Sequence, residues 1–109
     1  MGVRIDALLH WLCLQKSRSM AARGCREGEI LLNGRAVRPA KEVRVGDWIS
    51  LAQRGRERWI SVEILALPAR QVSRAGARDY YRPLQDADRP VAEDPDAERT
   101  RPGGREGRA

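Results

Sequence analysis

The chain has 109 residues, of which 33% are charged, and carries 21 Lys and Arg against 15 Asp and Glu, a net charge of +6 at pH 7. This length allows one small folded domain with at most a tail, and it excludes an enzyme with a separate substrate-binding domain. The apolar runs are too short to cross a membrane, and the N-terminus lacks the apolar stretch of a secretory signal, so we expect a cytoplasmic protein.

Two amphipathic helices are predicted at the start of the chain. Residues 4–13 place Ile5, Leu8, Leu9 and Leu12 at the i, i+3, i+4, i+7 spacing of one helix face. A second helix is predicted between Ser17, a favoured N-cap, and Gly28, a favoured residue just beyond a helix end. At about 100° per residue, this helix divides into two faces. The small apolar face holds Met20, Ala21, Gly24 and Cys25, and the basic face holds Arg18, Arg23 and Arg26 together with Ser19 and Ala22.

Short strands and turns are predicted for the following segments. Residues 29–33 read as a strand that ends in Asn33-Gly34, a strong two-residue turn signal. Residues 35–38 return from this turn, and Pro39 limits them to an edge or a bend. Residues 48–52 and 58–66 are further strand candidates on either side of a polar loop at 53–57. In the last strand Ile60, Val62 and Ile64 share one face. This order predicts an α+β fold with two N-terminal helices packed on a small, mainly antiparallel sheet.

The chain is expected to divide into three parts. Residues 1–67 form the folded domain, and residues 68–85 form a C-terminal extension in which Ser73 could cap a short helix running as far as Leu84. Residues 86–109 are polar, rich in Pro and Gly and nearly free of large apolar groups. We expect this last part to be a disordered tail.

Positive charge is concentrated in the first third of the chain. Residues 1–41 contain 8 basic and 3 acidic side chains, which favours a polyanion-binding face. Near the second helix, Lys16, Arg18, Arg23 and Arg26 can bind phosphate, with Ser17 and Ser19 as hydrogen-bond donors. Arg35, Arg38 and Lys41 can extend the same surface beyond the turn. The alternative interpretation of such a helix is a solvated basic face.

Catalytic and metal sites are not predicted. His10 is the only histidine, and Cys13 and Cys25, the two cysteines, are expected to be small buried apolar side chains. No four-ligand zinc set, nucleophile–base arrangement or glycine-rich phosphate loop is recognisable. We therefore expect a protein that is not an enzyme and that uses no cofactor and no metal.

The basic segments and turns together carry a family resemblance. The stretch RIDALLHWLCLQKSRSMAARGCREGEILLNGRAVRPAKEVRVGDWIS resembles the S-four RNA-binding domain, in which two helices and a β-hairpin form the RNA-contacting αL motif. The resemblance implies RNA contact by Arg4, Lys16, Arg18, Arg23, Arg26, Asn33, Arg35, Arg38 and Lys41. It also implies that Asp6 orients basic side chains instead of touching RNA.

Among such proteins the chain is most similar to the free-standing heat-shock protein fifteen family, and the segment ILALPARQVSRAGARDYYRPL resembles that family's continuation. This implies a ribosome-associated protein that binds large-subunit ribosomal RNA, and possible contact with peptidyl-tRNA, on subunits left after translation fails. Cys25 departs from the larger aliphatic residue usual in the family, and the tail is shorter and charge-balanced. Two alternatives stay open: a subunit that brings RNA to a separate modifying enzyme, and a DNA-binding protein.

Overall fold

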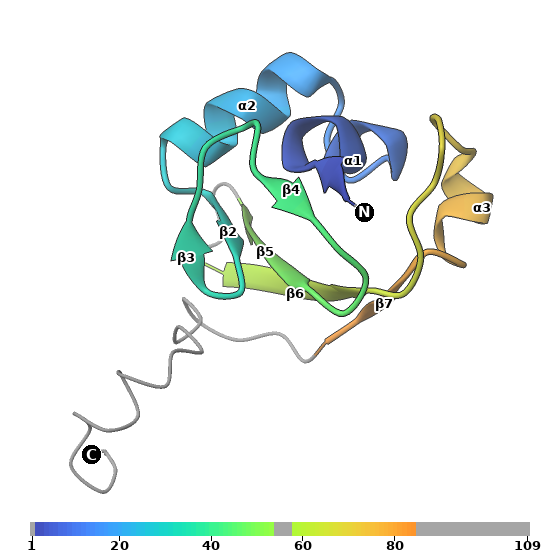
Figure 1. Ribbon diagram of the computed structural model, residues 1–109. Helices are drawn as coiled ribbons and strands as arrows, with labels where there is room; N and C mark the ends of the chain where they lie inside the picture. Colours follow the sequence, from blue (N-terminus) through green and yellow to red (C-terminus); the bar gives the residue numbers. More distant parts are fainter. Residues whose placement is uncertain (1, 54–57, 85–109) are drawn as a thin grey trace, which may run out of the picture.

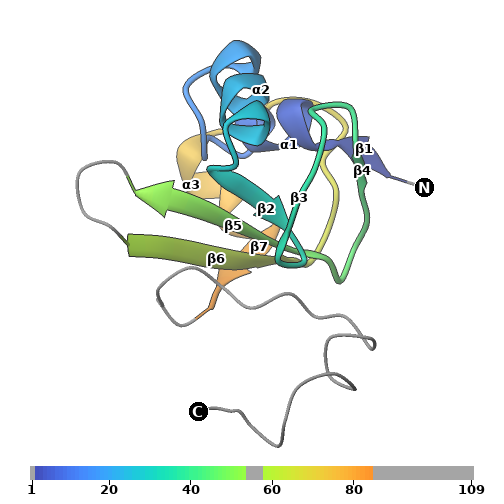
Figure 2. The ribbon, with the colours of Figure 1, turned by 90° about the vertical axis from the view of Figure 1, so that its left-hand side faces the viewer.

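The chain folds as two helices on one face of an antiparallel sheet (Figure 1). The computed structural model describes residues 2–53 and 58–84. The helices are α1 (Ile5–Trp11), α2 (Arg18–Arg26) and α3 (Arg74–Ala77), and the strands are β1 (Val3–Arg4), β2 (Ile30–Leu32), β3 (Arg35–Ala36), β4 (Glu42–Val43), β5 (Trp48–Gln53), β6 (Arg58–Ile64) and β7 (Tyr81–Pro83). The main sheet has the order β3-β2-β5-β6-β7, and β1 pairs with β4 in a separate small sheet. Figure 2 shows α1 and α2 over the same face of the main sheet. The predicted α+β fold is confirmed.

The apolar face of α1 lies at the centre of the core. Ile5, Leu8, Leu9 and Leu12, which carry the predicted helical spacing, are at most 1% exposed. They belong to one buried cluster with residues of β2, β5 and β6. The helix ends at Trp11, and Cys13 beyond it has a φ of 61°, in the left-handed region that non-glycine residues seldom occupy. None of the helices in the described residues is long and apolar enough to span a bilayer.

Helix α2 packs closely because its inner face is built from small residues. Its predicted N-cap is confirmed, since Ser17 Oγ accepts a hydrogen bond from Met20 N at 3.1 Å. Gly28 follows the helix with a φ of 75°, which explains the glycine at the predicted stop. A Cβ atom at Gly24 would lie 2.6 Å from Ile30 Cδ1, so a larger residue there would require the Ile30 side chain to move.

The assignment of residues to the two faces of α2 was partly wrong. Met20, placed by the periodicity on the packing face, is 44% exposed, whereas Ala22, placed on the basic face, is buried. The buried face of α2 is formed by Ala21, Ala22, Gly24 and Cys25, so it is rotated away from Met20 and includes Ala22.

The turn at Asn33-Gly34 connects β2 to β3 as predicted. Asn33 and Gly34 have φ values of 52° and 84°, the positive values that this two-residue hairpin turn requires. The Asn33 side chain is bonded at both ends: Nδ2 donates to Asp47 Oδ1 at 3.2 Å, and Oδ1 accepts from Trp48 N at 3.0 Å. These bonds attach the turn to the start of β5, the neighbour of β2 in the sheet.

In the longest strand pair, β5 with β6, successive side chains lie on opposite faces of the sheet. Val62 and Ile64 are buried in the core, as their alternation predicted, and Ile60 packs against that core. On the opposite face Ser50 Oγ and Ser61 Oγ form a hydrogen bond of 2.8 Å across the pair. Trp48 and Trp59, on this second face, are half-buried.

The predicted helix of the C-terminal extension is shorter than the sequence suggested. Ser73 caps it as expected by accepting from Gly76 N at 3.0 Å, but the helix ends at Ala77 instead of reaching Leu84. Residues 81–83 form β7, an edge strand paired with β6. These residues pair with β6 instead of continuing the helix, because Tyr80 O accepts hydrogen bonds from Leu65 N and Ala66 N and tyrosine favours extended backbone. The expected polar loop at 53–57, apart from Gln53, and the expected tail at 86–109 lie outside the described residues.

The core position of Leu9 gives a test of this packing. Leu9→Ala is expected to lower the free energy of unfolding by about 2–5 kcal/mol, because the substitution removes buried apolar area and leaves a cavity. Val45→Ala is the matched control, since Val45 is 59% exposed and its truncation should cost no more than about 0.5 kcal/mol. Urea denaturation measures both. Equal stability of the two variants would contradict the central position of α1.

Candidate nucleic-acid interface

One buried carboxylate holds two arginines of the predicted surface. Arg4 Nε lies 3.2 Å from Asp6 Oδ1 and Arg4 Nη2 lies 3.0 Å from Asp6 Oδ2, a bidentate pair. Arg18 Nη2 lies 3.5 Å from Asp6 Oδ1. The Asp6 side chain is 7% exposed, whereas those of Arg4 and Arg18 are 54% and 48% exposed. The acid is thus inside the protein, and the two arginine side chains that it holds are about half exposed at the surface.

Backbone hydrogen bonds bring a third segment to the same place. Ile5 N donates to Lys41 O at 2.8 Å and Asp6 N donates to Pro39 O at 3.2 Å. Pairing of β1 with β4 continues this attachment, with Arg4 opposite Glu42. The predicted contact residues Arg38 and Lys41 are exposed on that segment. Arg4, Arg18 and the 38–41 segment therefore gather at the N-terminal end of α1.

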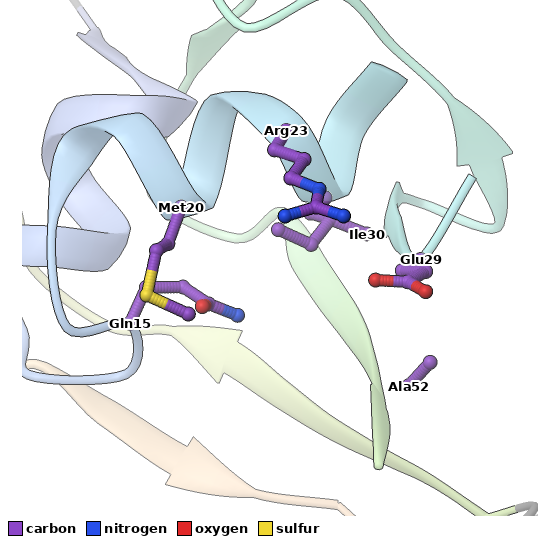
Figure 3. Close-up of a pocket in the computed structure, with 7 residues that line it drawn as sticks. Gln15, Met20, Arg23, Glu29, Ile30 and Ala52 are labelled. Carbon is purple, nitrogen blue, oxygen red and sulfur yellow. The ribbon is translucent and has the colours of Figure 1, made fainter. Parts of the chain in front are cut away.

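Arg23 lies apart from this cluster. It follows Arg18 by five residues, which places it about 140° around the helix. Its Nε donates to Glu27 Oε2 at 2.9 Å, and this hydrogen bond, together with the Glu27 charge, raises the pKa of Arg23. Figure 3 shows the Arg23 side chain beside a cavity of about 160 Å³ that Met20, Glu29 and Ala52 also line. The structure therefore divides the predicted basic face of α2 in two.

Two of the remaining predicted residues also have structural hydrogen bonds, and the others are exposed. Ser17 is used as the helix cap, although its hydroxyl proton can still be donated. Asn33 has a structural role in the turn, and RNA contact by its side chain stays a prediction. Lys16, Ser19, Arg26 and Arg35 are exposed. Arg44, which the sequence analysis did not single out, lies 3.5 Å from Glu42 Oε1 through its Nη2. It lines a cavity of about 340 Å³ together with Asn33, Lys41 and the acidic residues Glu42 and Asp47.

The described residues give little support for a metal site or for a cysteine nucleophile. No group of three or more His, Cys, Asp or Glu side chains could hold a metal ion there. Both cysteines are free thiols; Cys25 is buried as expected, but Cys13 is only half-buried. Burial, with a further contribution from the Asp6 charge, raises the pKa of the Cys25 thiol to about 11. Cys25 is therefore a packing residue and a poor nucleophile.

The chain is similar to known proteins in sequence and in fold. Residues 3–49 match the model of the S4 domain. Two proteins named RQC P-site tRNA stabilizing factor, from Helicobacter pylori strains J99 and 26695, are each 37% identical over 82 residues, which cover 74% of this chain and 95% of theirs. The trimeric structure of heat shock protein 15 from Vibrio cholerae matches with a TM-score of 0.70 and 26% identity, over 77% of this chain and 83% of that one.

The chain belongs to the S4-domain family of RQC P-site tRNA stabilizing factors. The S4 match runs from β1 into β5, so the Asp6 cluster and the Asn33-Gly34 turn lie inside it. The C-terminal extension lies beyond the S4 match, although β7 completes the main sheet.

Asp6 allows fixed geometry to be separated from total charge. Asp6→Asn raises the net charge above +6, yet we expect about tenfold weaker binding to structured RNA, because Arg4 and Arg18 lose the charged partner that fixes them. Fluorescence anisotropy with a labelled ribosomal RNA fragment measures the affinity, and circular dichroism checks the fold.

Glu63→Gln is the matched control for this prediction. It raises the net charge by the same amount, but Glu63 pairs with Arg82 between β6 and β7, away from the cluster. The control is expected to bind RNA at least as well as the unmodified protein. Tighter binding by both variants would mean that only total charge matters.

Proposed function

We propose that the protein is a non-enzymatic, ribosome-associated RNA-binding factor of large-subunit quality control, contacting ribosomal RNA and the P-site tRNA in the cytoplasm. The observation that carries this proposal is the Asp6 cluster, in which one buried acid fixes two half-exposed arginines inside an S4 domain. The names of the Helicobacter pylori relatives support the tRNA and quality-control part. They favour this function over DNA binding and over delivery of RNA to a modifying enzyme.

The mechanism follows from the charges and their restraint. Arg and Lys side chains that approach the phosphates of the RNA release the counterions condensed there, so affinity falls with rising salt. A guanidinium group has five donors, and the bidentate bond to Asp6 leaves some of the Arg4 donors for phosphate. Because the arginines are held before RNA arrives, little side-chain freedom is lost on binding. The fixed spacing selects RNA shape more than base sequence.

The residues proposed to contact RNA are those derived above. They are Arg4, Lys16, Ser17, Arg18, Ser19, Arg23, Arg26, Asn33, Arg35, Arg38 and Lys41. Stabilisation of a bound tRNA requires binding and positioning but no bond cleavage. The proposed role therefore needs no catalytic group, metal or cofactor.

Removing two arginines of α2 tests the proposal. The double variant Arg18→Gln/Arg23→Gln is expected to bind large ribosomal subunits carrying P-site tRNA at least about tenfold more weakly, because each charge-assisted hydrogen bond contributes about 1.5 kcal/mol or more. The slope of log affinity against log salt should fall by about 1 per lost phosphate contact. Co-sedimentation at several salt concentrations measures both quantities. Glutamine keeps the side-chain length and avoids a second carboxylate beside Asp6.

The control is Arg78→Gln/Arg82→Gln, which lowers the net charge equally. Arg78 and Arg82 are exposed and lie in the C-terminal extension, outside the S4 match. The control should bind close to normally. Unaltered affinity of the folded Arg18→Gln/Arg23→Gln protein would overturn the proposed function.

A further inference from the structure

A second basic groove lies at the opposite end of α1 from Asp6. It has a volume of about 480 Å³ and is lined by His10, Cys13, Gln15, Lys16, Gln71 and Arg74, among others. Four of these residues come from the end of α1 and the connection to α2, and two come from the C-terminal extension. The sequence analysis assigned no function to Gln71 or Arg74.

The groove exists because the C-terminal extension is attached to the end of α1. Val72 N donates to Trp11 O at 3.1 Å, and the Cys13 thiol donates to Val72 O at 3.4 Å. The left-handed backbone of Cys13, with a φ of 61°, ends the helix beside Val72. Gln71 and Arg74 flank this attachment point. Both are therefore presented next to a helix end more than fifty residues away in the chain.

The charges of this groove are unbalanced. Lys16 and Arg74 both line it, both are exposed, and neither forms an ion pair within residues 2–53 and 58–84. No carboxylate is among the lining residues, and Gln15 and Gln71 add amide donors. By contrast Arg4, Arg18 and Arg23 each have an acidic partner. Two unpaired cations beside one groove repel each other, and an anion bound between them removes that repulsion.

The size of the groove favours a ligand larger than a lone ion. Its volume of about 480 Å³ lies within the range of about 300–1,000 Å³ typical of sites for small organic ligands. The half-buried side chains of His10, Cys13 and Leu14 give the groove a less polar side against which a ribose or base can pack. Phosphate, ribose and base occur together in the backbone of RNA.

We propose that this groove binds the backbone of RNA as a second site, with Lys16 and Arg74 on phosphate and Gln15 and Gln71 as further donors. The inference rests on the proposed function and extends its RNA-binding surface to the C-terminal extension. Lys16 and Arg18 flank Ser17, so the two sites meet at the start of α2. Helix α1, of 7 residues, separates their other members by about 10 Å. Two sites on one rigid scaffold bind the same RNA more tightly than either does alone.

The test compares two charge reversals four residues apart. Arg74→Glu is expected to weaken binding to large ribosomal subunits carrying P-site tRNA by about tenfold or more. Arg78→Glu is the control, because Arg78 is also exposed and lies in the same extension but does not line the groove. It should have little effect. Repeating both titrations with subunits lacking tRNA shows the RNA source: a loss kept without tRNA indicates ribosomal RNA, and a loss seen only with tRNA indicates tRNA.

The outcomes separate this inference from the proposed function. Equal affinities of the Arg74→Glu and Arg78→Glu proteins would overturn the groove as a binding site. If Arg18→Gln/Arg23→Gln still weakens binding in that case, the proposed function stands without the second site. If the Arg18 and Arg23 substitutions also have no effect, both proposals fail.

Modification of the Cys13 thiol gives a second readout, which can be taken first on the protein with all its cations in place. Cys13 lines the groove, whereas Cys25 is buried and its pKa is about 11, so N-ethylmaleimide at about pH 8 should modify Cys13 first. Saturation with large ribosomal subunits carrying P-site tRNA is expected to slow modification of Cys13 at least about tenfold. In the Arg74→Glu protein, at equal occupancy, this protection should be reduced. An unchanged rate in the saturated unmodified protein would contradict the proposal.

Discussion

The ion cluster around Asp6 connects the fold of this protein to its surface chemistry. A carboxylate that is 7% exposed has lost most of its water, a loss that only good partners can offset. Arg4, Arg18 and the backbone N–H of Ala7 are those partners. They come from β1, α2 and α1, so the cluster is complete only when these elements have assembled. In the folded protein, the need to satisfy one buried acid fixes the position of two cations.

The rest of the small domain keeps these elements in place. Hydrogen bonds from Ile5 and Asp6 to the 38–41 segment attach the start of α1 to the chain beyond the hairpin. At the other helix, Gly24 lets α2 lie close to the Ile30 side chain of β2. The first contact uses only backbone atoms and the second is apolar, so neither uses a side chain that is proposed to bind RNA. Both determine where such groups lie, since a movement of α2 would separate Arg18 from Asp6.

The cations fall into two classes that suit different tasks. Arg4 and Arg18 are restrained by a buried acid, and Arg23 by the exposed Glu27 on the same helix. Lys16 and Arg74 have no acidic partner among the described residues and face a groove. Restrained groups lose little freedom on binding and favour one RNA geometry. Unpaired groups keep their full charge and therefore contribute more to long-range attraction. The RNA-binding surface proposed above benefits from both.

The sequence by itself determined the features that depend on neighbouring residues. The spacing of Ile5, Leu8, Leu9 and Leu12 gave α1, Ser17 gave the start of α2, and Asn33-Gly34 gave the hairpin, because periodicity, capping and turn geometry are local. The concentration of charge and the S4 pattern indicated RNA. Only the tertiary structure decided that residues 81–83 join the sheet, that Arg18 pairs with the buried Asp6, and that Arg74 shares a groove with Lys16. These facts depend on strand pairing and on contacts between segments far apart in the chain, which the local sequence does not specify.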